Sequence, residues 1–337
     1  MHFSYHSLRK KGVVVLLLIG MSIGLFSGCG KKEDLTTVKL TEVAHSIFYA
    51  PMYVAIEEGY FEEEGIDLQL ENGLGADKTM TAVLSGDADI GFMGSEASIY
   101  VYNEGAEDYV VNFAQLTQRA GNFLVAREAQ ENFNWQTLKG KTVIGGRAGG
   151  MPQMVFEYIL KKHGIDPKED LTIIQNIDFG VTAQAFAGGT GEYTVEFEPG
   201  ATALETEGSG YVVASLGVES GYVPYTAYSA KKSYMEKNPE VIKGFVAALQ
   251  KGMDYVAKHT PAEIAEVIQP QFAETELETL TTIVTRYYEQ DTWKTNLVFE
   301  EDAFTLLQDI LEEAGELEKR VPYEVLVDTT YAKEVIK

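Results

Sequence analysis

The segment IDLQLENGLGADKTMTAVLSGDADIGFMGSEASIYVYNEG, residues 66–105, decides the fold class of this chain. It reads as a strand over 66–71, a helix over 76–86, a strand over 88–94 and a helix over 95–105 that Ser95 caps. Just upstream, a strand over 37–44 precedes a helix that Pro51 opens and Gly59 ends. Strands alternate with helices throughout, which predicts an α/β fold with a mostly parallel sheet.

A second series of strands and helices begins near Trp135. It follows two strand-like runs, YVVNFAQLT and NFLVARE, and has a glycine-rich loop between its first strand and a helix that Pro152 opens. The pattern predicts strands over 141–146, 171–177, 192–197 and 211–217, and helices over 152–164 and 181–189. Because this series has enough strands for a sheet of its own, the chain is expected to form two lobes.

Past residue 232 the composition becomes helical, and Asn238 with Pro239 opens a long amphipathic helix. We expect this C-terminal part to pack on the first lobe. The resulting division places lobe 1 at residues 37–125 and 226–337 and lobe 2 at residues 126–225, with crossovers near 121–127 and 222–230. Closure of the lobes about these crossovers would be a hinge motion, with Gly221 as a candidate hinge position.

The N-terminal residues predict export and a lipid anchor. Arg9, Lys10 and Lys11 precede the uncharged run GVVVLLLIGMSIGLF, and small residues then lead to Cys29. This is similar to a bacterial lipoprotein signal over residues 1–28, with Cys29 as the lipidated first residue and residues 29–36 as a tether. Phe26 departs from that pattern, because leucine is more usual there; an ordinary cleavable signal is the alternative.

Charge and cysteine content exclude several classes of function. Cys29 is the chain's single cysteine, so neither a disulfide framework nor a cysteine nucleophile is expected in the folded part. Removal of the three positive charges of the signal takes the formal net charge from −24 to −27. A body this acidic disfavours nucleic acid and anionic lipid as partners.

Four further segments carry a resemblance to a known family: APMYVAIEEGYFEEEGIDL, LSGDADIGF, LKGKTVIGG and VPYTAYSAKKSYMEKNPEVIKGFVAAL. Together they resemble the substrate-binding lipoproteins of ABC importers, in the branch of thiamine-pyrimidine, alkanesulfonate and taurine binders. The resemblance implies a two-lobed type II periplasmic binding protein fold, a small ligand held between the lobes, and a membrane permease with its ATPase as partners. We expect no enzymatic activity, cofactor or metal, and we expect a monomer.

The expected ligand site lies where strands end, because ligands of open parallel sheets bind beyond the carboxyl ends of strands. Six such junctions, at 45–50, 73–77, 93–95, 145–151, 178–180 and 196–199, would meet if the lobes face each other. The candidate ligand-binding residues from these junctions are Phe48, Tyr49, Gly75, Met93, Gly94, Ser95, Gly146, Arg147, Gly149, Met151, Asp178, Phe179 and Glu198.

Each candidate has a structural alternative. Phe48 and Tyr49 could stack on a planar ligand or belong to the core, and Met93 could form a soft wall or plain core. The glycine loop matches neither common nucleotide fingerprint, but its amides and Arg147 could clamp an acceptor-rich solute. Arg147 could instead form a salt bridge between the lobes.

The class of ligand remains open between two alternatives. The acceptors Asp178, Glu196 and Glu198, with the aromatic residues, favour a nitrogen heterocycle such as a thiamine-pyrimidine precursor, whereas Arg147 favours a sulfonate. The acidic body favours the heterocycle. A ligand-sensing subunit would share the fold and is a further alternative. An enzyme related to the pyrimidine synthases is another, but the cysteine-rich motif of those synthases is missing from this chain. His45, His163 and His259 are far apart in sequence and do not suggest a metal site.

Overall fold

The computed structural model describes residues 35–336, except for the side chain of Phe179. The predicted signal segment, Cys29 and most of the predicted tether lie outside these residues. Within them, no helix has both the length and the apolar character that crossing a membrane requires.

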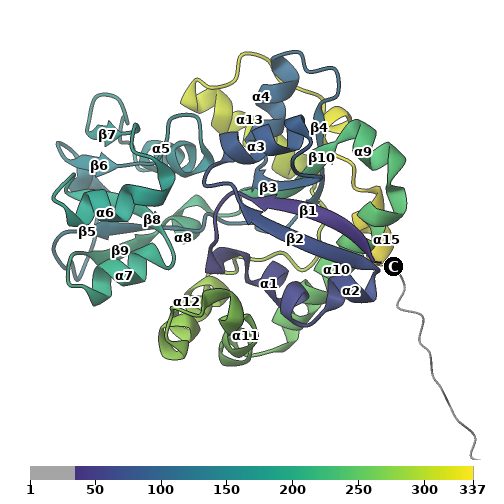
Figure 1. The fold of residues 1–337 in the computed structure, drawn as a ribbon. Helices are drawn as coiled ribbons and strands as arrows, with labels where there is room; N and C mark the ends of the chain where they lie inside the picture. Colours follow the sequence, from purple (N-terminus) through teal and green to yellow (C-terminus); the bar gives the residue numbers. More distant parts are fainter. Residues whose placement is uncertain (1–34, 337) are drawn as a thin grey trace, which may run out of the picture. The chain divides into compact units, whose positions relative to one another are not determined.

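The first sheet has the strand order β2-β1-β3-β10-β4 (Figure 1). Its parallel strands β2, β1 and β3 are followed by β10, which pairs antiparallel with both β3 and β4. Four strands therefore run in one direction and β10 runs against them. The strand bounds are β1 Thr36–Glu42, β2 Ile66–Asn72, β3 Ile90–Gly94, β4 Val110–Gln115 and β10 Thr226–Lys231.

The second sheet repeats this plan in the order β7-β6-β8-β5-β9. Its strands β7, β6 and β8 are parallel, and β5 pairs antiparallel with β8 and β9. The prediction of two mostly parallel α/β lobes is confirmed, since four of the five strands in each sheet share one direction. The strand bounds are β5 Asn122–Ala126, β6 Thr142–Ile144, β7 Thr172–Ile174, β8 Tyr193–Phe197 and β9 Tyr211–Ser215.

The strand that opposes its neighbours in each sheet is the strand that the chain enters on crossing over. The first crossing joins β4 to β5, and the second joins helix α8 (Leu216–Ser220) to β10. Gly221 lies in the second crossing with φ 73° and ψ −155°, a conformation that glycine adopts without strain.

Helices cover the sheets as the proline and glycine positions predict. Pro51 lies in the first turn of α1 (Ala50–Glu57), and Gly59 separates it from α2 (Tyr60–Glu63) with φ 73°. Pro152 lies in the first turn of α5 (Met151–Lys162). The remaining helices of the two lobes are η1 Ile47–Tyr49, α3 Ala76–Ser85, α4 Glu96–Asn103, η2 Trp135–Leu138, η3 Phe179–Val181, α6 Thr182–Ala187 and α7 Gly200–Thr206.

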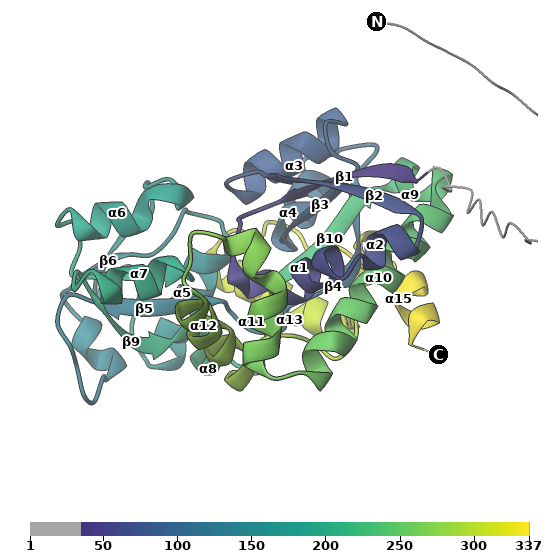
Figure 2. The same ribbon diagram turned by 60° about the horizontal axis from the view of Figure 1, so that its bottom comes forward.

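The helical C-terminal part packs on the first lobe, as predicted. Helix α10 (Pro239–Lys258) contacts α1 and α2 (Figure 2), and a Cβ added at Gly252 would approach the Pro51 carbonyl to 2.2 Å. Helix α13 reaches further and packs against α5 of the second lobe. The other C-terminal helices are α9 Lys232–Lys237, α11 Pro261–Ile268, η4 Gln269–Phe272, α12 Leu277–Glu289, α13 Glu301–Ala314, α14 Tyr323–Leu326 and α15 Thr330–Val335.

Candidate functional site

Two adjoining pockets lie between the lobes. The larger, here the main pocket, has a volume of about 220 Å³ and is lined by Glu196, Asn122 and His45 among others. The smaller, here the side pocket, has a volume of about 60 Å³ and is lined by Glu96 and Tyr49 among others. Three residues line both pockets, which therefore adjoin: Arg147, Pro152 and Phe197.

All six predicted strand-end junctions contribute to these two pockets. The first lobe provides residues from 44–46, 49, 75–76, 94 and 96, and the second provides residues from 146–152, 180–184 and 195–200. The carboxyl-end rule for parallel sheets therefore located the cleft correctly.

Glu196 is a buried acid of the main pocket. It is the fourth residue of β8 and is only 5% exposed. Thr194 donates to its Oε1 at 2.6 Å and Thr182 to its Oε2 at 3.0 Å. Burial nevertheless raises the pKa of Glu196 to about 7, because these hydroxyls offset only part of the desolvation. Near neutral pH this carboxyl can accept or donate a hydrogen bond.

Asn122 supplies a donor to the same pocket. It is the first residue of β5 and is 1% exposed. Its Oδ1 accepts a hydrogen bond from the hydroxyl of Tyr225, while its Nδ2 is buried and has no partner among the described residues. A buried amide without a partner is costly, so this group is suited to a solute with an acceptor.

His45 lies at the first-lobe side of the main pocket and is held from both ring nitrogens. Nδ1 lies 2.8 Å from Glu42 Oε1, and Nε2 lies 2.9 Å from the carbonyl oxygen of Gln271. The ring stacks on Phe272, and Tyr53 donates to the second carboxylate oxygen of Glu42 at 2.6 Å. The hydrogen bond to Glu42 raises the pKa of His45. The imidazole is therefore held in place by the first lobe through both ring nitrogens.

Most amides of the glycine loop are already hydrogen-bonded to other groups of the protein. Gly149 donates to Oε1 of Gln153, and its carbonyl accepts from the hydroxyl of Tyr100. The backbone of Met151 hydrogen-bonds the Glu96 carboxyl of the first lobe. The loop is therefore an attachment between lobes, whereas the sequence suggested amides that are free to clamp a solute. Gly146 lines the main pocket with φ 92°.

Arg147 lines both pockets but is also engaged across the cleft. Its Nη2 lies 3.9 Å from Asp77 Oδ1, and both side chains are about half exposed. The interlobe ion pair that the sequence left as an alternative is therefore present. Solvent screens such an exposed pair, so Arg147 remains available at the rim.

The two aromatic candidates differ in position. Phe48 is fully buried against Tyr49, Phe197, Tyr225 and Tyr287, and it lines neither pocket. Tyr49 is 1% exposed and lines the side pocket.

The β2–α3 and β3–α4 junctions bring four candidates to different places. Gly94 and Gly75 line the side pocket, whereas Met93 is buried in a small hydrophobic cluster. Ser95 occupies the N-cap position of α4, but its side chain makes no capping hydrogen bond and its Oγ is buried without a partner among the described residues. The prediction that Ser95 caps the helix through its side chain is therefore wrong: the backbone at Ser95 is already helical, with φ −70° and ψ −14°.

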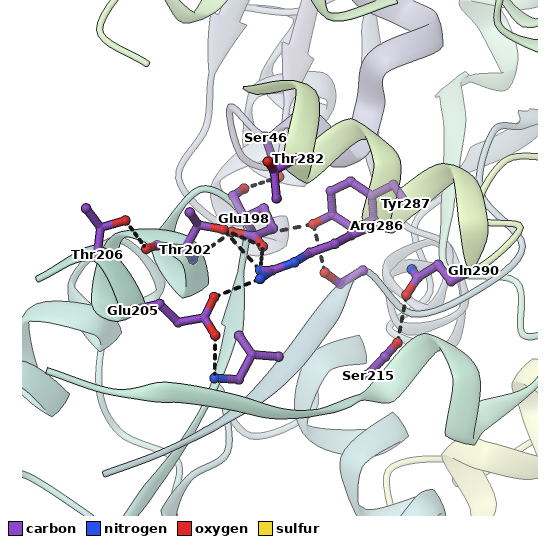
Figure 3. A network of polar contacts seen from close by, with 12 residues as sticks. Ser46, Glu198, Thr202, Glu205, Thr206, Ser215, Thr282, Arg286, Tyr287 and Gln290 are labelled. Carbon is purple, nitrogen blue, oxygen red and sulfur yellow. Dashed lines mark hydrogen bonds and ion pairs between the residues drawn. The ribbon is translucent and has the colours of Figure 1, made fainter. Parts of the chain in front are cut away.

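Glu198 lies at the main pocket, but its carboxylate is occupied (Figure 3). Arg286 donates to its Oε1 at 2.7 Å, and the amide of Thr202 donates to its Oε2 at 2.8 Å. Asp178 is exposed and lines neither pocket, and Met151 lines the side pocket. Phe179 begins η3, and its side chain lies outside the described part of the structure.

Sequence reasoning missed two of the polar groups that the cleft contains, Glu96 and Asn122. Glu96 follows Ser95 directly and is the acid in an otherwise small and apolar junction, GSEAS. Asn122 follows Gly121 at the first crossover. The available signal was a polar residue at the end of a strand for Glu96 and a polar residue at the crossover for Asn122. Among residues 35–336, no group of three or more His, Cys, Asp or Glu side chains could hold a metal ion.

Comparison with known proteins adds a family and a fold. The model of the family described as NMT1/THI5 like matches residues 47–264. The protein YtlA of Bacillus subtilis (strain 168), which is named as a binding protein, is 49% identical over 309 residues, covering 92% of both chains. A 4-amino-5-hydroxymethyl-2-methylpyrimidine phosphate synthase of Aspergillus parasiticus is 22% identical over 233 residues, covering 66% of both.

Among solved structures, the alkanesulfonate-binding protein SsuA of Xanthomonas axonopodis pv. citri superposes with a TM-score of 0.71. It is 14% identical and covers 87% of this chain and 98% of its own. The two-lobed binding-protein fold expected from the sequence is thereby confirmed.

Proposed function

This chain belongs to the NMT1/THI5-like family, and we propose that it is a solute-binding protein of an ABC importer whose ligand is a small nitrogen heterocycle of the aminopyrimidine type. The solute would lie in the main pocket and be enclosed by closure of the two lobes. No covalent step is involved. The relative named as a binding protein and the fold shared with SsuA support the binding role.

Glu196 is the observation that carries the choice of ligand. An aminopyrimidine places an amino N–H donor beside a ring-nitrogen acceptor. A carboxyl whose pKa is about 7 can accept from the amino group and, when protonated, donate to the ring nitrogen. The two threonine hydroxyls that contact Glu196 each donate a single hydrogen, so both oxygens keep acceptor capacity.

The rest of the main pocket matches a solute of this size and polarity. Its volume of about 220 Å³ lies below the range of drug-sized sites and suits a monocyclic compound. Asn122 would donate from its unpartnered Nδ2 to a second acceptor on the solute. The names of the distant synthase relatives refer to a phosphorylated aminopyrimidine, which supports this chemistry.

An enzymatic role has less support than binding. The resemblance to the pyrimidine synthases implies that their activity uses a cysteine-rich motif. This chain has a single cysteine, Cys29, which lies outside the described residues. Both ring nitrogens of His45 are engaged by Glu42 and Gln271.

The proposed assembly follows from the predicted signal. The protein would be exported, anchored to the outer face of the membrane through lipid on Cys29, and would deliver its solute as a monomer to a permease driven by a cytoplasmic ATPase. The acidic body, with a formal net charge of −24 for the whole chain, makes nucleic acid an unfavourable partner.

A sulfonate is the second candidate ligand, and Arg147 favours it. This guanidinium lines both pockets and suits bidentate recognition of a sulfonate. The replacement Arg147→Ala separates the candidates: a heterocycle should lose less than about threefold in affinity, because the rim charge is screened. A sulfonate should lose at least about tenfold, the cost of a charge-assisted hydrogen bond.

The test is a thermal-shift and calorimetric titration of the purified protein with 4-amino-5-hydroxymethyl-2-methylpyrimidine and, separately, with taurine and ethanesulfonate. Ligand at about 100 times its dissociation constant should stabilise the protein by about 2.7 kcal/mol, enough to raise the midpoint by a few degrees. The replacement Glu196→Gln should weaken pyrimidine binding by about tenfold or more.

Glu192→Gln is the matched control, since Glu192 precedes β8 and is exposed in a pair with Lys141. It should leave affinity unchanged. A shift with the sulfonates alone would refute the heterocycle proposal and make Arg147 the centre of the site. Equal losses in the Glu196 and Glu192 variants would refute the role given to Glu196.

A further inference from the structure

The side pocket contains a buried acid, Glu96, that does not line the main pocket and whose carboxyl is only partly hydrogen-bonded. Glu96 is the first residue of α4 and is 2% exposed. Its Oε2 is buried and has no hydrogen-bond partner among residues 35–336. The side chain folds back over Gly94, where an added Cβ would lie 2.1 Å from that oxygen. An acceptor thus stands unpaired at the wall of an interlobe pocket, which is costly unless something binds it.

The protein leaves this carboxyl without a buried cation. The backbone of Met151 and that of Glu96 itself hydrogen-bond the group, and Arg147 lowers its pKa from a distance. Burial outweighs these contributions and raises the pKa to about 7. Arg147 is half exposed and lies 3.9 Å from Asp77, so it does not neutralise Glu96 by direct contact. The missing component is a donor that enters from the pocket.

The other walls of the side pocket are apolar or aromatic. Tyr49, Met151 and Tyr225 are each no more than 2% exposed, and Glu96 is the acid among the lining residues. A donor placed here would be shielded from water, which strengthens its attraction to a carboxylate. The same carboxylate would repel an anionic group, so the side pocket would select against solutes with an anionic branch.

The size and connection of the side pocket define what can enter. Its volume of about 60 Å³ admits a substituent of one or two heavy atoms and not a whole solute. It shares Arg147, Pro152 and Phe197 with the main pocket. To contact both acids, a solute whose ring lies against Glu196 in the second lobe would extend a short branch past these shared residues toward Glu96 in the first.

We propose that Glu96 determines ligand specificity by binding a short cationic substituent, an aminomethyl-type ammonium, on the solute that the main pocket holds. This rests on the proposed function and narrows it from nitrogen heterocycles in general to those that carry a basic branch. The solute would then contact one carboxyl from each lobe, Glu196 and Glu96, so that binding itself draws the lobes together.

The test compares two probes of nearly equal shape, 4-amino-5-aminomethyl-2-methylpyrimidine and 4-amino-5-hydroxymethyl-2-methylpyrimidine, by calorimetry on the full protein. The wild-type chain should bind the aminomethyl probe about tenfold to a hundredfold more tightly, as expected for a hydrogen bond to a charged group. Glu96→Gln should remove this preference, mainly by weakening the aminomethyl probe, so that the two probes bind within about threefold of each other.

Glu104→Gln is the control, because Glu104 is the exposed C-cap residue of the same helix α4; it should leave the preference intact. If Glu96→Gln does not fold, Glu96→Asp keeps the charge and should retain part of the preference. Equal binding of both probes by the wild type, or an equal loss for both in Glu96→Gln, overturns the inference while the proposed function stands. If neither probe binds to the wild type, the proposed function fails and the inference fails with it.

Discussion

Arg286 of α12 donates to Oε1 of Glu198 at 2.7 Å, and this contact joins the helical C-terminal part to the loop that follows β8 (Figure 3). The second guanidinium nitrogen donates to Oε2 of Glu205 at 2.8 Å. Because the Glu198 side chain is fully buried and also accepts from Thr202, its charge is balanced by Arg286 alone among its described contacts. The pair is therefore an element of stability between lobes.

We expect Arg286→Ala to lower the free energy of unfolding by about 3 kcal/mol, because it leaves the buried carboxylate of Glu198 unpaired. Urea denaturation measures this change. Arg320→Ala is the control, since Arg320 pairs with Asp309 and Glu312 on an exposed surface and should cost less than about 1 kcal/mol. If the two variants lowered the free energy of unfolding equally, burial of Glu198 would not determine the strength of its ion pair with Arg286.

Two of the buried acids of the cleft, Glu96 and Glu196, should make the unliganded protein less stable as the pH rises. Burial raises the pKa of both Glu96 and Glu196 from 4.5 to about 7, so the native state binds more protons than the unfolded state between these values. Their contribution to the free energy of unfolding is fully present below about pH 4.5 and is lost as the pH rises through about 7. Each group should add a slope of up to about 1.4 kcal/mol per pH unit.

Urea denaturation between pH 5 and pH 8 tests this expectation. Glu196→Gln should flatten the decline, whereas Glu192→Gln should not, because Lys141 lowers the pKa of Glu192 and moves its contribution below this range. A decline of the same slope in wild type and Glu196→Gln would contradict the assignment.

Gly221 should be intolerant of a side chain although space surrounds it. Apart from its chain neighbours, no atom of residues 35–336 lies within 4 Å of an added Cβ, but φ 73° with ψ −155° is a conformation that only glycine adopts readily. Gly221→Ala should lower the free energy of unfolding by about 1–3 kcal/mol. If the second crossover is the hinge, affinity for the pyrimidine probe should also change.

Gly315→Ala is the comparison, because Gly315 also has open space around it and φ 82°, with ψ 18° at the end of α13. Its left-handed conformation is one that other residues can adopt at a cost of about 1–2 kcal/mol. The hinge proposal would be refuted by an affinity that is the same in wild type and Gly221→Ala.

Two buried serines should respond in opposite ways to alanine. Ser46 donates from its Oγ to the carbonyl oxygen of Glu198 at 2.7 Å and accepts from the amide of Phe48. Its loss should cost about 1–3 kcal/mol, since it leaves a buried carbonyl of the other lobe unpaired. Ser95→Ala removes a hydroxyl that has no partner among the described residues, so stability should stay unchanged or rise. Thermal unfolding of the ligand-free variants distinguishes the two, and a costly Ser95→Ala would contradict the structure.

Much of the fold was accessible from sequence because it rests on local patterns. Alternating apolar residues and the positions of Pro51, Pro152 and Pro239 mark strands and helix starts through short-range steric and hydrogen-bonding preferences. The carboxyl-end rule then located the cleft, since it depends only on strand direction. By contrast, no local signal showed that β5 and β10 run against their neighbours, because strand direction within a sheet depends on where the crossovers lead.

The sequence by itself determined the lobes, the junctions and the class of protein, since these depend on periodicity and on motifs shared with a family. The tertiary structure decided which junction residues meet in the cleft. The sequence offers Glu198 as an acceptor, but Arg286, 88 residues away in sequence, pairs with it. The sequence leaves Phe48 open between a ligand contact and the core, and four aromatic rings bury it. Glu96 and Asn122 became candidates for the opposite reason: burial left each with an unpaired polar atom. Such outcomes depend on long-range contacts and desolvation, which no single stretch of sequence encodes.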